Sequence, residues 1–245
     1  MKGKRYGRID ALRGVLLAGM VTYHGMWDLV YLAGWEVPWF SALPGRIWQQ
    51  SIAWGFILLS GFCASLGRGG PARSLALLGW SAFISAVTAF FFEEEAIYFG
   101  ILSLMGSCGL IAWAARPVLR CMPPVTAGAV SFLLFFLSWG IPLRYIGTGP
   151  WEIPVPSEWY QYMAGAYLGF APGDFHSLDY FPLLPWMFLF FAGYMAGRQA
   201  ERAGVLPHLA GHAGAAGCLG RHSLPVYLLH QPVLTGLFQL GGMLS

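Results

Sequence analysis

RIDALRGVLLAGMVTYHGMWDL, residues 8–29, decides the fold class, because this apolar run is long enough to cross a bilayer. Asp10 and Arg13 stand at its start, and His24 and Asp28 stand near its far end. Ionisable groups inside a membrane helix are costly, and those that occur usually face a bundle interior or a water-filled cavity. The run therefore predicts a membrane helix that carries a functional site.

The whole chain has the composition of an integral membrane protein. Of its 245 residues, 57% are hydrophobic and 10% are charged, whereas a soluble domain has about 25% charged residues. The net charge of +3 comes from basic residues that mark membrane orientation, and no nucleic-acid-binding pattern is present. No cleavable signal peptide is evident. The four cysteines lack metal-ligand spacing, so neither a metal site nor a disulfide is expected.

Seven apolar stretches are long enough, or nearly so, to cross a bilayer. They predict an all-α, multi-pass bundle of about seven helices that forms one domain over residues 1–245. The stretches are 11–33, 47–67, 74–92, 97–115, 124–141, 181–198 and 222–243. Two glycine-rich pieces, 66–71 and 209–220, are predicted to be turns.

Charge separates the connecting segments into two groups, as the positive-inside rule expects. One group is basic: Lys2, Lys4, Arg5, Arg8, Arg68, Arg73, Arg116, Arg120, Arg198, Arg202 and Arg221. The other is acidic, with Arg46 and Arg144 as its basic residues: Glu36, Glu93, Glu94, Glu95, Glu152, Glu158, Asp174 and Asp179. The N-terminus is therefore expected in the cytoplasm and the protein in the cell (inner) membrane.

The connection 142–180 is much longer than the others and is expected on the outer face. It is rich in Pro, Gly, Trp and Tyr, and connections of this length are usually functional. Its aromatic residues have two interpretations, as anchors in the membrane interface or as part of a lid over a site.

The first helix places its ionisable groups on one face. Arg13 and His24 are eleven residues apart, close to three turns and roughly 16 Å along the axis. Asp28 follows His24 at i+4, where its carboxylate could orient the imidazole and leave the other ring nitrogen free as a base. The alternatives are a helix start with a snorkelling Arg13 and a His24 that is merely packed.

Other polar residues form two further groups. Tyr227, His230 and Gln231 share one face of the last helix and resemble a cavity wall, although helix–helix hydrogen bonds would also explain them. Asp179, Tyr180 and Trp186 come from DYFPLLPW, where the sixth helix opens, and this segment has two interpretations: a kinked helix start with Trp186 as an interface anchor, or the entrance to a binding site. Arg198 and Arg221 obey the charge rule and would also suit phosphate groups.

Four segments together resemble the bacterial relatives of heparan-alpha-glucosaminide N-acetyltransferase, within the transmembrane acyltransferases. They are RIDALRG with the Arg13 to His24 spacing, IYFGILSLMG (97–106), DYFPLLPWMFLFFAGYMAGR (179–198) and LGRHSLPVYLLHQPVL (219–234). DYFPLLPW is the most specific of these. The family commonly has FGILH where this chain has FGILS, so Ser103 replaces a histidine, and a serine cannot take up a proton near pH 7.

The resemblance implies an acyltransferase that uses cytoplasmic acetyl-CoA and modifies a sugar or glycolipid at the outer face. His24 and Asp28 are then the catalytic residues. Arg13, Arg198, Arg221 and Ser103 are expected to hold the donor. The acceptor is expected to contact Asp179, Tyr180, Trp186, Tyr227, His230 and Gln231. Seven helices are few for enclosing coenzyme A, so a homodimer in the lipid bilayer is compatible with this interpretation.

Two other functions explain the same residues. A small transporter or a non-catalytic accessory protein could use the polar stripes for permeation or docking, because a shared fold does not fix a function. A folded but inactive family member would explain Ser103.

Overall fold

The structure, a computed structural model, describes residues 6–67 and 70–242. Lys2, Lys4, Arg5 and Arg68 of the predicted basic face therefore lie outside the described residues. The chain forms two compact units: unit 1 comprises Met1–Phe56 and Gly204–Ser245, and unit 2 comprises Ile57–Ala203. The boundary falls inside one helix, and each unit is described by itself. The prediction of a single domain stays a prediction.

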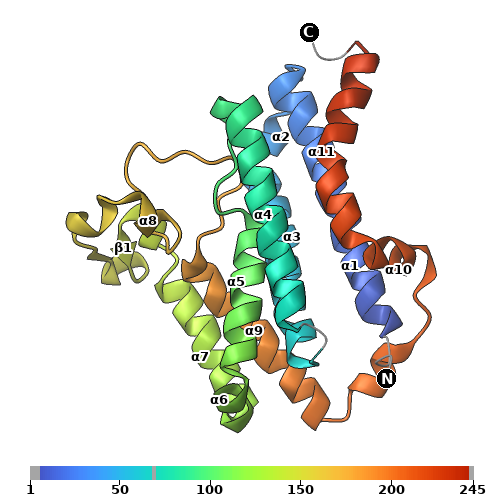
Figure 1. The fold of residues 1–245 in the computed structure, drawn as a ribbon, viewed down its shortest axis with the longest axis vertical. Helices are drawn as coiled ribbons and strands as arrows, with labels where there is room; N and C mark the ends of the chain where they lie inside the picture. The colour runs from blue at the N-terminus through green and yellow to red at the C-terminus, as the bar shows by residue number, and fades with distance from the viewer. Residues whose placement is uncertain (1–5, 68–69, 243–245) are drawn as a thin grey trace. The chain divides into compact units, whose positions relative to one another are not determined.

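Unit 1 brings the two ends of the chain together. Helix α1 (Gly7–Trp27) continues into a π-helical turn, η1 (Asp28–Leu32), and packs against α10 (Gly214–Arg221) and α11 (Ser223–Leu240). Figure 1 shows α1 in blue beside α11 in red. The short α2 (Pro38–Ser41) and the first part of α3 (Leu43–Ser65) complete the unit. There, the rings of Tyr23, Phe40 and Trp48 pack together, a grouping typical of a membrane interface.

The contact between α1 and α10 depends on close backbone approach. A Cβ added at Gly14 would overlap the carbonyl oxygen of Ala216, so a larger residue would force the helices apart. Small residues allow this type of packing between membrane helices. The prediction that 209–220 is only a turn was therefore wrong. Its glycines pack one helix against another over most of the segment, after a short 3-10 helix, η6 (Leu206–Ala210).

Among its described residues, unit 2 contains four further long helices and the short α6. They are α4 (Pro71–Phe91), α5 (Ile101–Ala114), α6 (Arg116–Cys121), α7 (Pro124–Leu137) and α9 (Leu183–Arg202). Helix α9 packs against α7 and α5, and α5 packs against α4. The last part of α3 contacts α9 at Gly193, where a Cβ would overlap the Leu58 carbonyl oxygen. The buried core of the unit includes Phe135, Leu189 and Phe190.

The start of α9 is set by its prolines. Pro182 precedes the helix and Leu184 is extended, with φ −98° and ψ 132°, as the residue before a proline prefers. Regular helix therefore begins at Pro185, and both prolines stand at the helix start.

The connection 142–180 folds into short elements. These are 3-10 helices η3 (Ile141–Leu143), η4 (Gly149–Trp151) and η5 (Ser157–Tyr160), a hairpin of β1 (Tyr145–Ile146) and β2 (Ile153–Pro154), and α8 (Met163–Ala166). The Tyr160 hydroxyl donates to the Ile141 carbonyl at 2.5 Å. The Tyr180 hydroxyl donates to the Ala166 carbonyl at 2.6 Å. Its own buried residues and hydrogen bonds hold this segment in place.

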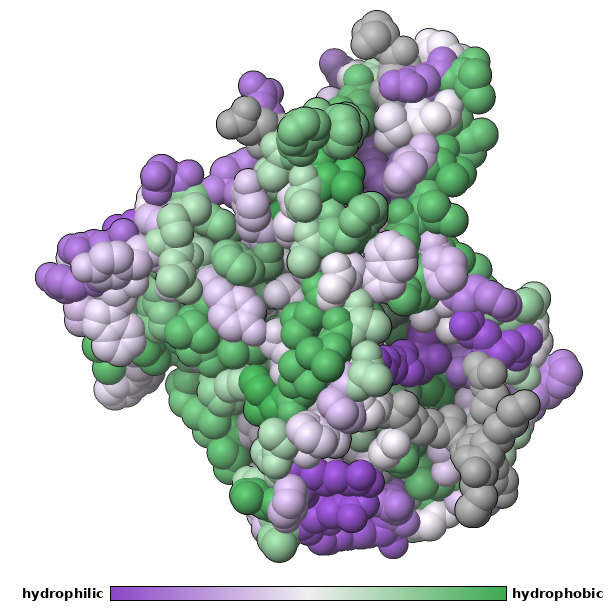
Figure 2. All heavy atoms as spheres, in the orientation of Figure 1, coloured by the Kyte–Doolittle hydropathy of each residue, from purple (hydrophilic) through white to green (hydrophobic). Residues whose placement is uncertain are grey.

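The all-α prediction is confirmed apart from that hairpin, and every predicted span contains a helix. In the described residues, 4 helices are long and apolar enough to cross a membrane: Gly7–Leu32, Leu43–Ser65, Pro71–Phe91 and Pro124–Leu143. Helix α5 has 14 residues, about 21 Å, less than the roughly 30 Å of a hydrocarbon core. Figure 2 shows hydrophobic side chains over much of the visible helical surface. Seven crossings and a cytoplasmic N-terminus stay predictions.

Candidate functional site

Unit 1 gathers the polar residues of the first and last helices into one cluster, which we call the His24–His230 cluster and define as His24, Asp28, His230 and Gln231. The two imidazole rings lie edge to face, with centroids 4.8 Å apart. Gln231 Nε2 donates a hydrogen bond to Asp28 Oδ1 at 2.7 Å. Asp28 is fully buried. The structure thus brings together residues that two separate helices were predicted to contribute.

Both imidazoles have nitrogen atoms with spare hydrogen-bonding capacity. His230 Nδ1 lies 2.6 Å from the Tyr227 carbonyl oxygen, one turn earlier on α11. His230 Nε2 is buried and has no hydrogen-bond partner among the described residues, and the same holds for Gln231 Oε1. Among those residues His24 also makes no side-chain hydrogen bond; its ring contacts Tyr23 and His230. The prediction that Asp28 orients His24 stays a prediction, because the hydrogen bond described for Asp28 comes from Gln231.

Backbone irregularities flank the cluster on both helices. Asp28 is the first residue of η1, and π-helical turns of this kind often occur at functional sites. Pro232 lies inside α11 directly after Gln231 and cannot donate to the carbonyl of Leu228. Neither feature was predicted from the sequence. Pro232 was visible in the sequence as a helix interruption, whereas nothing in it signalled the π-helical turn.

In the same unit, Arg13 and Arg221 lie at the same height along α1. Gly14 of α1 lies against the backbone nitrogen of Gly220 in α10, and each arginine is the chain neighbour of one of these glycines. Arg13 Nη1 donates to Asp10 Oδ1 at 3.0 Å in an ion pair one turn apart. Arg221 is exposed at the last turn of α10. Two cations thus stand at one level, about three turns from His24 on α1.

The other predicted site residues belong to unit 2, and two of them, Asp179 and Ser103, are associated with α5. Asp179 Oδ2 accepts a hydrogen bond from the Ile101 backbone nitrogen at 3.2 Å, so this carboxylate caps the helix. Ser103 lies in the first turn of α5 and is buried. Its carbonyl oxygen accepts a hydrogen bond from Ser107 Oγ at 2.7 Å. Asp179 therefore stabilises the segment that carries Ser103.

Three more predicted residues take part in packing or in backbone hydrogen bonds. Trp186 is 7% exposed and packs against Phe135 and Trp139. Arg198 is 9% exposed, and its Nη1 donates to the carbonyl oxygens of Leu119 and Met122. Tyr180, as described above, bonds to Ala166. Their predicted contacts with donor or acceptor stay predictions.

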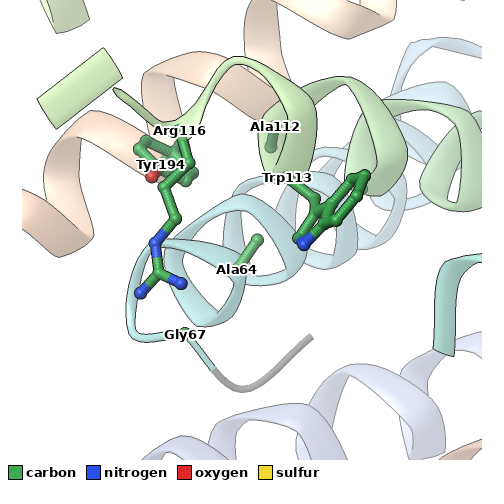
Figure 3. A pocket seen from close by; sticks show the side chains of 7 residues that line it. Ala64, Gly67, Ala112, Trp113, Arg116 and Tyr194 are labelled. Atoms are coloured by element: carbon green, nitrogen blue, oxygen red, sulfur yellow. The ribbon is translucent and has the colours of Figure 1, made fainter. Parts of the chain in front are cut away.

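Unit 2 also has a cavity of about 20 Å³ between α3, α5 and α9. Figure 3 shows the Arg116 side chain reaching past Tyr194 toward Gly67, with Trp113 opposite. The volume suits about one water molecule, so this cavity does not accommodate a substrate. Among the described residues, no group of three or more His, Cys, Asp or Glu side chains is arranged to hold a metal ion.

The sequence profile of one known family matches almost the whole chain. That family is described as heparan-alpha-glucosaminide N-acetyltransferase, catalytic, and the match covers residues 5–232. The chain belongs to this family. The resemblance found in the sequence is thereby confirmed. No curated protein and no solved structure was found to match the chain.

Membership of the heparan-alpha-glucosaminide N-acetyltransferase family agrees with the apolar helices, and the chain is a membrane protein of an acetyltransferase family. The match extends from the start of α1 into α11 and ends directly after Gln231. It therefore includes every residue of the His24–His230 cluster.

Proposed function

We propose that this protein transfers an acetyl group from cytoplasmic acetyl-CoA to an amine or hydroxyl of a sugar or glycolipid at the outer face of the cell membrane. The observation that carries the proposal is the His24–His230 cluster, in which two imidazoles meet beside a buried carboxylate–amide pair. Polar and ionisable side chains inside the membrane cost free energy, so a cluster of them is by default a functional site. Family membership supplies the reaction class.

His24 acts on the reacting atoms in this proposal. As a general base, it takes the proton from the acceptor while the acceptor's nitrogen or oxygen bonds to the acetyl carbonyl carbon. The carbon–sulfur bond then breaks, and the proton passes to the departing thiolate, giving free coenzyme A. As an acetyl carrier, it would instead bond to the acetyl group first and pass it on. Both routes need a neutral imidazole nitrogen, and both conserve atoms and charge.

Arg13 and Arg221 hold the donor phosphates. Guanidinium groups bind phosphate oxygens in a planar fork, and these two stand at one level of unit 1. The extended arm of coenzyme A would follow α1 from that level to His24. Asp28 and Gln231 fix the cluster, and Tyr227 and His230 contact the acceptor. Arg198, Ser103, Asp179, Tyr180 and Trp186 belong to unit 2, and their predicted roles in binding stay predictions.

His24→Ala tests the proposal in proteoliposomes that hold the full chain and radiolabelled acetyl-CoA. We expect acetyl transfer to glucosamine to fall by roughly 100-fold or more, the usual effect of removing a general base. His212→Ala is the matched control, because this histidine is exposed on the link before α10. Unchanged turnover in His24→Ala would remove the mechanism.

Ligand binding separates the enzyme from a transporter or an accessory protein. Acetyl-CoA should raise the melting temperature of the detergent-solubilised protein, because a ligand that binds only the folded state stabilises it. Acetate at the same concentration should have no effect. Uptake of sugar into vesicles that lack acetyl-CoA would favour the transporter instead.

A further inference from the structure

A second cavity lies in the segment between α7 and α9 of unit 2, away from every residue of the His24–His230 cluster along the chain. Its volume is about 310 Å³, at the lower end of the range for small-molecule sites. Its lining consists of Pro142, Arg144, Tyr180 and residues 171–173 and 175–177. Among these described lining residues none is acidic.

Arg144 is held in place at this cavity. Its φ of 71° is in the left-handed region, which a residue with a side chain adopts only when its surroundings impose it. Its guanidinium carbon lies 5.0 Å from the centre of the Tyr160 ring, within the range of a cation–π contact. The Tyr160 hydroxyl is itself fixed on the Ile141 carbonyl. Within the described chain Arg144 has no carboxylate partner, so its charge is positioned but not neutralised.

The remaining walls complement this charge. His176 is exposed at the rim and offers a further N–H donor. Burial raises the pKa of the Tyr180 hydroxyl, so the group stays neutral and adds no negative charge to the cavity. The Phe175 ring packs 5.0 Å from the Tyr180 ring, centroid to centroid, and stacks on Phe99. The lining of the cavity therefore contains both a cation and aromatic rings.

The geometry points to a binding site for a small organic oxyanion, a carboxylate or a phosphate ester, in this cavity. Its oxygens accept hydrogen bonds from the Arg144 fork, and its carbon body lies against Phe175 and Tyr180. A guanidinium binds both kinds of oxyanion in the same planar way, and the cavity is large enough for a molecule of monosaccharide size. The inference does not depend on acetyl transfer, since it concerns binding by other residues.

Binding of three sugars to the full chain in phosphatidylcholine nanodiscs tests the inference by calorimetry. Glucuronate and glucose 6-phosphate carry the two oxyanions, and glucose carries none. We expect both anions to bind and glucose to bind roughly tenfold or more weakly, because charge-assisted hydrogen bonds supply the difference. Arg144→Gln should weaken anion binding about tenfold or more. Arg46→Gln, which neutralises an exposed arginine at the start of α3, should leave it unchanged.

A second variant guards against a folding defect, because Arg144→Gln also loses the contact with Tyr160. His176→Ala removes the N–H donor of an exposed rim residue, and it should weaken anion binding a few-fold with an unchanged melting temperature. A lipid headgroup could also supply the oxyanion, and nanodiscs that contain phosphatidylglycerol test this. Weaker binding of glucose 6-phosphate in these nanodiscs than in phosphatidylcholine supports an oxyanion site that a lipid headgroup also occupies. Equal binding of glucose and glucuronate, or full anion affinity in both variants, would overturn the inference.

Discussion

Gln231 Nε2 and Asp28 Oδ1 are joined by a 2.7 Å hydrogen bond across 203 positions of sequence. This bond links the π-helical turn after α1 to the part of α11 that precedes Pro232. A hydrogen bond to a buried carboxylate contributes more than one between neutral groups. It therefore fixes the two helices at the level where the histidine rings meet.

Gln231→Leu should lower the free energy of unfolding by about 1.5–3 kcal/mol, because the buried Asp28 carboxylate loses a donor. Chemical denaturation in detergent measures the change. Gln239→Leu on the same helix is the control, since that side chain is exposed and its loss should have little effect. Equal stability of the two variants would mean that the bond contributes nothing.

Gly193→Ala should destabilise the protein by about 1–3 kcal/mol, the cost of overpacking a tight contact, because the new Cβ would overlap the Leu58 carbonyl. Gly79→Ala in α4 is the matched control. An added Cβ there meets no atom within 4 Å, so the variant should be neutral or gain up to about 1 kcal/mol from helix propensity. Thermal unfolding of both variants measures the contrast, and similar shifts would contradict this packing of α3 on α9.

Asp179→Ala should lower stability by about 0.5–2 kcal/mol through loss of the cap on α5. Asp179→Asn keeps an oxygen acceptor and should retain most of that stability. Kinetic measurements on the same variants test the predicted acceptor contact. If the carboxylate binds the acceptor, Asp179→Asn raises KM for the acceptor at an unchanged melting temperature; an unchanged KM would leave Asp179 with its capping role.

Arg198→Met should lower the free energy of unfolding by about 1.5–3 kcal/mol, since the carbonyls of Leu119 and Met122 lose a charged donor. Arg202→Met, four residues later and exposed, is the control. Denaturation of the two variants gives the comparison. The same stability in both would show that the buried guanidinium is not needed to hold the end of α6.

Much of the fold could be predicted because local patterns in the sequence mark the helices. Apolar stretches of the right length mark helices wherever they occur, and Pro185 ends up at a helix start for reasons of local backbone geometry. The prediction was less accurate where distant segments decide. Helix α5 starts four residues later than expected because Ser177 holds the backbone of Tyr98 and Asp179 caps Ile101.

The candidate site shows the same division. The sequence by itself determined that α1 carries Arg13, His24 and Asp28 on a membrane helix and that α11 carries Tyr227, His230 and Gln231 on one face, because helical periodicity fixes which residues share a side. Only the tertiary structure decided that His24 meets His230, that Asp28 bonds to Gln231, and that Asp179 and Arg198 hold helix ends. Those contacts join segments far apart in the chain, and the packing of glycine-containing helix surfaces sets their register, which no local pattern encodes.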